Sequence, residues 1–259
     1  MKLKNKKEWL FLKSFELLKN NPNKFGLIIL FDVLFLVSIY ILQKLVGYFA
    51  GSLSIPVTLA SAFIYIIFSL IYYLILLFVY SFFKYCILDL VKSLFEKIEF
   101  SFNKLGHFYL LNVILILPAL LVFSFLLENI KDYYQPFAFL AFGIPLSIFL
   151  YPLVNISQSY YYNGTSIKQS ICKGFSTTFT KLNIYKQTIL IMILSAFFLL
   201  LLLLGSGYLM SFIAPKNFNL YVYFTNATII FFYLVFYLVI LINRISFYQI
   251  TKKVQLQDS

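Results

Sequence analysis

Six long apolar runs constrain the fold of this chain more than any other feature of its sequence. Five of them carry no charged side chain: Ile55–Phe83, Leu105–Leu127, Tyr133–Ile167, Gln187–Pro215 and Asn217–Asn243. The sixth, Phe25–Gln43, carries only Asp32. About 20 mostly apolar residues in a helix are enough to cross the roughly 30 Å hydrocarbon core of a bilayer. The runs therefore predict membrane-spanning helices at about 25–47, 55–83, 106–127, 135–157, 186–212 and 218–243.

The low charge content argues against a water-soluble protein. Only 12% of the residues are charged and the mean hydropathy is +0.90, whereas about a quarter of the residues of a soluble domain are charged. Six consecutive apolar helices of this length are not expected in the core of a soluble protein. We therefore predict an all-α, polytopic membrane protein in which residues 1–259 form a single membrane domain.

The basic residues lie almost entirely on one side of the predicted spans. Of the 21 lysines and arginines, only Lys44, Lys131 and Lys216 fall in loops on the other side. Because cytoplasmic loops carry the excess of basic residues, we predict a plasma-membrane protein with both termini in the cytoplasm. The formal net charge of +12 suits anionic lipid headgroups as partners. Nucleic acid is not expected as a partner, since no soluble basic domain is recognisable.

A short polar sequence recurs at intervals of about eighty residues. It reads NKFG at 23–26, NKLG at 103–106 and TKLN at 180–183. An apolar stripe of helical period precedes each copy, through Phe11, Phe15 and Leu18, then Ile87, Val91, Leu94, Phe95 and Ile98, then Ile167, Ile171, Phe175 and Phe179. Basic and polar residues fill the positions between. This pattern is typical of helices that lie in the membrane interface, and a solvated loop helix is the alternative.

The even-numbered spans also end alike. Their ends read Ser81-Phe82-Phe83, Ser159-Tyr160-Tyr161 and Ser246-Phe247-Tyr248. With the stripes, they predict three units at 8–84, 87–162 and 165–250, each an amphipathic interfacial helix followed by a transmembrane hairpin. Because each unit crosses the membrane an even number of times, the three copies are predicted to be parallel repeats.

The segment YYYNGTSIKQSICKGFSTTFTKLNIY (160–185) resembles a pattern in poorly characterised prokaryotic six-helix membrane proteins. In these proteins, an aromatic helix end and an Asn/Arg-Gly turn lead into an amphipathic segment before the next span. The group includes the membrane domain attached to some glycerophosphodiester phosphodiesterases. The resemblance covers the whole chain in architecture. It implies no catalytic residue here, because the chemistry of the fused proteins belongs to a soluble partner domain.

Polar residues recur at similar positions of the odd-numbered spans. Asp32 is the only acidic residue within a span, Asn112 lies eighty residues later, and Gln187 and Thr188 lie near the matching position of the third copy. A carboxylate at this depth is expected to face protein or water, or to be protonated. The four residues are therefore a candidate intramembrane polar site for a substrate or a proton. The structural alternative, hydrogen bonding between helices, is favoured because there is no second buried carboxylate.

The residues that usually perform catalysis or bind metals are scarce. His107 is the only histidine, and Cys86 and Cys172 are not spaced as a metal-binding pair. We therefore predict no catalytic residue, no metal site and no cofactor, and expect that the protein is not an enzyme.

The sequence favours a non-enzymatic, lipid-associated or partner-binding membrane protein with basic surface helices. Its predicted contacts with anionic lipid are lysines near the three stripes, namely Lys13, Lys19, Lys24, Lys92, Lys97, Lys104, Lys168, Lys173 and Lys181. The alternative is a small-molecule or ion permease that uses the polar layer around Asp32 and Asn112.

Overall fold

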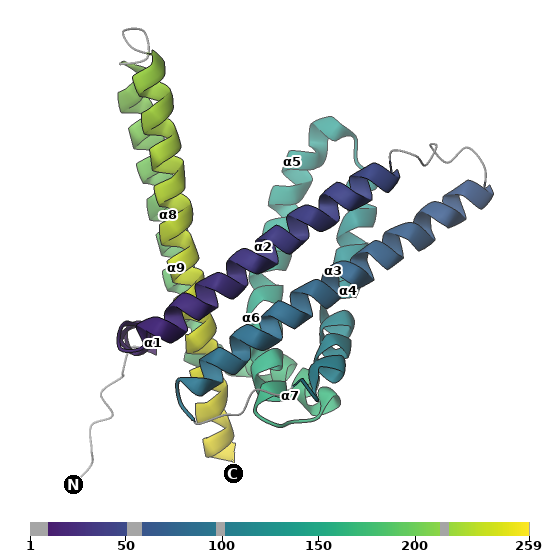
Figure 1. The fold of residues 1–259 in the computed structure, drawn as a ribbon, viewed down its shortest axis with the longest axis vertical. Coiled ribbons are helices and arrows are strands. Elements are labelled where there is room, and N and C mark those ends of the chain that lie inside the picture. Colours follow the sequence, from purple (N-terminus) through teal and green to yellow (C-terminus); the bar gives the residue numbers. More distant parts are fainter. Residues whose placement is uncertain (1–9, 51–58, 97–101, 213–217, 259) are drawn as a thin grey trace. The chain divides into compact units, whose positions relative to one another are not determined.

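Helices and the short turns between them make up the described part of the protein. The computed structural model describes residues 10–50, 59–96, 102–212 and 218–258 (Figure 1). Their elements are α1 (Leu10–Lys19), α2 (Pro22–Ala50), α3 (Leu59–Ser93), α4 (Leu105–Glu128), the 3-10 helix η1 (Asp132–Tyr134), α5 (Gln135–Ala138), the π-helix η2 (Phe139–Gly143), α6 (Ile144–Tyr162), α7 (Ile167–Thr180), α8 (Leu182–Ser211) and α9 (Phe218–Asp258). None of these described residues forms a β-strand.

Six helical segments in these ranges are long and apolar enough to cross a bilayer. They are Pro22–Tyr48, Phe63–Ser93, Leu105–Leu127, Gln135–Tyr162, Leu182–Ser211 and Phe218–Gln255. Many of their apolar side chains are exposed, among them Leu36 at 64% and Phe197 at 58%. Such side chains suit a hydrocarbon solvent, in which a helix satisfies its own backbone hydrogen bonds. The prediction of an all-α, polytopic membrane protein is confirmed.

The second span extends beyond its predicted end. α3 has 35 residues, which at 1.5 Å per residue makes it about 52 Å long, well over the thickness of the hydrocarbon core. Its last seven residues, 87–93, belong to the stretch where the sequence predicts a separate interfacial helix, and they continue α3 without a break. Ile87 and Val91 of that stripe are buried. The last residue of that stripe, Ile98, lies outside the described residues, because 97–101 are not described.

The breaks between helices have local causes. Pro22 is the first residue of α2, a position that tolerates proline because its missing N–H would have no helical partner. After α6, Gly164 adopts a φ of +96°. Its N–H donates to the Tyr161 carbonyl at 3.0 Å, and the Thr165 N–H donates to the Tyr160 carbonyl at 3.3 Å. These two bonds form a Schellman motif, which ends α6 and turns the chain into α7.

The chain divides into two compact units. The hairpin unit comprises Met1–Leu17 and Lys181–Ser259, and the bundle unit comprises Leu18–Thr180. In the hairpin unit, α8 and α9 lie side by side (Figure 1), and the hydroxyls of Ser14 on α1 and Ser246 on α9 share a hydrogen bond of 3.0 Å. In the bundle unit, α2 packs on α3, α3 packs on α4, and α6 contacts both α4 and α7.

The core of the bundle unit lies at one end, where α3 and α6 end and α4 begins. Its buried members are Tyr85, Leu88, Phe108, Leu111, Leu115, Val154 and Tyr161. The start of α2 joins the same end, because Lys24 Nζ donates to the Ser93 carbonyl at 2.5 Å. Lys92, Lys104 and Lys168 lie in the segments that meet here, so we call it the lysine-rich end.

Small residues attach α7 to α6. Gly174 is buried, and a Cβ added to it would lie 1.9 Å from Ser157 Oγ on α6. One turn further along α7, the Thr177 hydroxyl shares a hydrogen bond of 2.9 Å with the Tyr160 hydroxyl. Small side chains at such a crossing let two helix backbones approach closely. α7 therefore folds back against α6 through a surface of small, polar residues.

The predicted apolar stripe of α7 divides into two parts. Ile167 and Ile171 pack against the core of the bundle unit. Phe175 and Phe179 are exposed, Phe179 at 63%, and their rings stack with centroids 6.3 Å apart. The Phe179 ring also lies 5.3 Å from that of Phe149 on α6. The buried face of α7 is thus its polar one, and half of its apolar stripe faces outward.

We predict that Gly174→Ala destabilises the protein by about 1–3 kcal/mol, because the new methyl group overpacks the crossing of α6 and α7. The measurement is thermal unfolding of the purified chain in detergent. Adding Ser157→Gly, which removes the nearest side-chain atoms, is expected to restore part of the loss.

The matched control is Gly205→Ala on α8, where an added Cβ meets no atom within 4 Å. Alanine is the better helix former by about 1 kcal/mol, so this variant should lose no stability. Equal losses from Gly174→Ala and Gly205→Ala would contradict the close crossing.

Candidate functional site

A chain of hydrogen bonds joins three helices inside the bundle unit. Gln158 on α6 donates from Nε2 to Asn112 Oδ1 on α4 at 2.7 Å and to the Tyr80 hydroxyl on α3 at 3.1 Å. Asn112 donates from Nδ2 to Ser81 Oγ at 2.9 Å. Gln158, Asn112 and Ser81 are fully buried. These bonds fix the rotation of α3, α4 and α6 about one another.

A buried lysine lies on the same faces of α3 and α6 as this network. Lys84 is 6% exposed and its Nζ donates to Asn155 Oδ1 at 2.9 Å. Asn155 is also buried and donates from Nδ2 to the Tyr151 carbonyl at 2.7 Å. The polar cluster therefore consists of Tyr80, Ser81, Lys84, Asn112, Asn155 and Gln158.

Helical spacing explains how two short sequence segments supply most of the cluster. Ser81 and Lys84 are three residues apart on α3, and Asn155 and Gln158 are three residues apart on α6. Residues at this spacing share one face of a helix. The two faces meet, and Asn112 on α4 completes the contact. Within the described residues, Gln158 Oε1 accepts no hydrogen bond, so the cluster retains one unused buried acceptor.

The predicted polar site is divided between the two units. Asp32 and Asn112 belong to the bundle unit, whereas Gln187 and Thr188 lie on α8 in the hairpin unit. Thr188 is buried and Gln187 is half-buried. The hydrogen bonds of Asn112 go to Ser81 and Gln158 and not to Asp32. The interhelical hydrogen bonding that the sequence left open as the structural alternative thus accounts for Asn112.

Asp32 is nonetheless buried, with 7% exposure. It follows Phe31 on α2, whose ring lies 6.5 Å from that of Phe83 on α3. The ring of Phe35, one turn on, lies 6.1 Å from that of Tyr80, a member of the polar cluster. These ring contacts place Asp32 on a part of α2 that packs at the level of the cluster.

Sequence reasoning missed most of the cluster because it looked for polar site residues in the odd-numbered spans alone. The sequence marks Ser81 only as part of a predicted helix end and gives Lys84, Asn155 and Gln158 no predicted role in a site. The spacing of Asn155 and Gln158 within an otherwise apolar stretch was the available signal. The partner of each residue could not be read from the sequence, because it lies on another helix.

The three serine–aromatic segments that the sequence places at span ends share one local arrangement, although α3 and α9 continue past theirs to Ser93 and Asp258. Ser81, Ser159 and Ser246 are all buried. Each hydroxyl donates to the carbonyl four residues earlier, at Leu77, Asn155 and Ile242 respectively. Such bonds are common for serine in membrane helices. The common arrangement agrees with three repeats, and the repeat itself stays a prediction.

The predicted lipid-contacting lysines differ in their surroundings. Lys13, Lys19, Lys104, Lys168 and Lys173 are exposed, Lys24, Lys92 and Lys181 are half-buried, and Lys97 lies outside the described residues. The Nζ of Lys92 lies 5.5 Å from the centre of the Tyr162 ring, and that of Lys173 lies 6.0 Å from the centre of the Tyr160 ring. These distances allow cation–π attraction. Among the described lysines at the lysine-rich end of the bundle unit, Lys104 and Lys168 are therefore the exposed ones whose ammonium groups have no such ring contact.

Aromatic rings close this end of the bundle. Tyr85 on α3 contacts the rings of Phe108 on α4 and Tyr162 on α6, with centroids 5.5 and 5.3 Å apart. The Tyr162 hydroxyl donates to Asp89 Oδ1, and the Tyr161 hydroxyl donates to the Lys104 carbonyl at 3.2 Å. The lysines are thus carried on a rigid, well-packed platform.

No protein-family model, curated protein or solved structure compared with the chain matches it. The resemblance to six-helix membrane domains therefore stays a prediction, and the function has to be argued from the chain itself.

We predict that Asn112→Leu and Gln158→Leu each lower the free energy of unfolding by about 1–3 kcal/mol, because each removes one hydrogen-bond partner from the other, buried amide. The double variant should cost less than the sum, with a coupling energy of about 0.5–2 kcal/mol. Reversible unfolding in mixed micelles, followed by circular dichroism, measures all three.

Thr228→Val on α9 is the control. This threonine is half-buried, and its hydroxyl donates to the Phe224 carbonyl of its own helix in an exposed hydrogen bond. A change within about 0.5 kcal/mol is expected, as for most surface substitutions. Strict additivity of Asn112→Leu and Gln158→Leu would show that the two amides do not depend on each other.

Proposed function

We propose that the protein is a non-enzymatic, multi-pass membrane protein that binds anionic lipid at its lysine-rich end. The outer surface of α7 is the observation that supports this best. Its small face is occupied by α6, so Phe175 and Phe179 are exposed together with Lys168 and Lys173. Exposed aromatic and basic side chains on one amphipathic helix are characteristic of contact with a lipid interface.

The lysines supply the preference for negative charge. Each lysine close to an anionic membrane surface contributes about 1 kcal/mol of attraction. Lys104 and Lys168 are exposed near the start of α4 and of α7, where a headgroup phosphate could reach them. We also propose that the protein lies in the plasma membrane with both termini in the cytoplasm, because the basic residues are so unequally divided between the two sides of the predicted spans.

We predict that anionic lipid stabilises the wild-type protein more than neutral lipid does, since a ligand that binds the folded state raises its unfolding temperature. The measurement compares unfolding temperatures in micelles containing phosphatidylglycerol or phosphatidylcholine. The double variant Lys104→Gln/Lys168→Gln should lose much of the difference, and added salt should reduce it in the wild type.

The charge-matched control is Lys44→Gln/Lys131→Gln, which removes two exposed lysines on the side where few basic residues lie. It should keep the wild-type response to phosphatidylglycerol. Equal losses in the two double variants would mean that only net charge matters, and the proposed surface would be rejected.

Transport of an ion or a small molecule is a second candidate function, favoured by the burial of Asp32 in a span. Intramembrane carboxylates are costly and commonly belong to a proton or substrate path. The buried Lys84 and the free acceptor of Gln158 add polar groups within the same unit.

For this second candidate, we predict that reconstituted wild-type protein moves protons across liposomes under a pH gradient and that Asp32→Asn abolishes the flux. Asp32→Glu should keep part of it, because it retains a titratable group. A dye that reports internal pH provides the measurement, and Glu16→Gln, an exposed acid on α1, is the control. Flux equal to that of empty liposomes would remove proton transport from consideration.

A further inference from the structure

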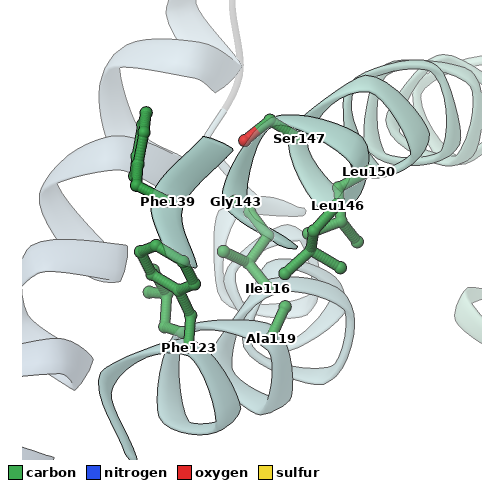
Figure 2. Close-up of a pocket in the computed structure, with 9 residues that line it drawn as sticks. Ile116, Ala119, Phe123, Phe139, Gly143, Leu146, Ser147 and Leu150 are labelled. Atoms are coloured by element: carbon green, nitrogen blue, oxygen red, sulfur yellow. The ribbon is translucent and has the colours of Figure 1, made fainter. Parts of the chain in front are cut away.

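A cavity of about 120 Å³ lies between α4 and the segment that contains η2 and α6. α4 contributes Ile116, Ala119 and Phe123 to its wall, and the facing segment contributes Phe139, Gly143 and Leu146. Figure 2 shows the rings of Phe123 and Phe139 along one side and the side chain of Leu146 on the other.

The backbone around Gly143 makes this space. Phe139–Gly143 form a π-helix, in which each turn holds more residues than in an α-helix, and such turns often mark functional sites. Gly143 is buried, and a Cβ on it would lie 3.0 Å from ring carbons of both Phe123 and Phe139. A larger residue would therefore push the two rings apart or fill the gap. The wide turn and the missing side chain together form the cavity.

The lining favours an apolar occupant. Ser147 carries the single polar side chain in the cavity wall, and the other lining residues are aliphatic, aromatic or glycine. Empty cavities with apolar walls stay dry and accept apolar guests. Phe139 is 49% exposed and Ser147 is also exposed, so the cavity has an open side through which a guest can enter.

The position along the spans identifies that guest. The walls belong to the spans Leu105–Leu127 and Gln135–Tyr162. Gly143 lies eight residues after Gln135, the first residue of the span Gln135–Tyr162. At 1.5 Å per residue this is about 12 Å along the helix. Gly143 therefore lies below the headgroups and within the hydrocarbon. The molecules that surround an open cavity at this depth are lipid acyl chains.

We propose that this cavity is a binding site for an acyl-chain segment of a membrane phospholipid. An engineered cavity of about 150 Å³ accepts benzene, so the space between α4 and α6 accommodates a short stretch of chain of comparable bulk. The edge-to-face pair of Phe123 and Phe139, with ring centroids 6.0 Å apart, offers a rigid wall for it. The site depends on chain packing and not on headgroup charge, so it stands apart from the anionic-lipid surface proposed above.

The test uses the full chain in phosphatidylcholine liposomes that contain a small fraction of phosphatidylcholine with a mid-chain diazirine. After irradiation, mass spectrometry maps the residues that carry lipid adducts. Adducts are expected to be enriched on Ile116–Phe123 and Phe139–Leu150 relative to the exposed leucines of α8. In Ala119→Phe, whose new ring fills the cavity, adducts on these segments should fall to the level of α8.

Gly143→Leu should have the same effect, and Gly205→Leu, which adds the same side chain at a position where an added Cβ meets no atom within 4 Å, should leave the wild-type pattern. If Gly143→Leu does not fold, Ala119→Phe and the wild-type enrichment still decide the matter. Adducts spread evenly over all exposed apolar residues, or unchanged in Ala119→Phe, would overturn the proposal. Because the liposomes are neutral, failure here would leave the anionic-lipid proposal untouched.

Discussion

The need to satisfy every polar group without water governs this structure. In hydrocarbon, an unpaired backbone N–H or C=O costs several kcal/mol, so each crossing segment has to be a helix. The same rule applies to polar side chains within the spans. Asn112, Gln158 and Ser81 are fully buried and bond to one another. Their hydrogen bonds hold three helices together where no hydrophobic effect drives helix association.

Packing in the bundle unit changes along its length. At the lysine-rich end, aromatic rings, buried amides and the close crossing of α6 and α7 leave little space. Toward the other end, the π-helix and Gly143 open a cavity against α4. A membrane protein can carry such a cavity because lipid chains are available to fill it. The two lipid proposals therefore concern different parts of the bundle, a charged and rigid end and an apolar, looser region.

The amphipathic pattern of α7 shows where sequence reasoning stops. The stripe of Ile167, Ile171, Phe175 and Phe179 correctly predicted a helix. It did not predict that the helix would attach by Ser170, Gly174 and Thr177, because hydrophobicity alone gives no weight to small residues. Closeness of approach decides helix contacts in membranes. The same pattern at Ile87 and Val91 predicted a separate helix. In the described residues, these two side chains instead belong to the buried end of α3.

The sequence by itself determined the helical class and the number and order of the apolar spans. These follow from composition and length. Each apolar run is long enough to cross the hydrocarbon, and backbone hydrogen bonding there requires it to be a helix. Only the tertiary structure decided which polar residues meet, since Asn112 takes its partners from α3 and α6. It also decided where space remains, because a cavity depends on how side chains from separate helices fit together. Neither property is encoded in any one segment.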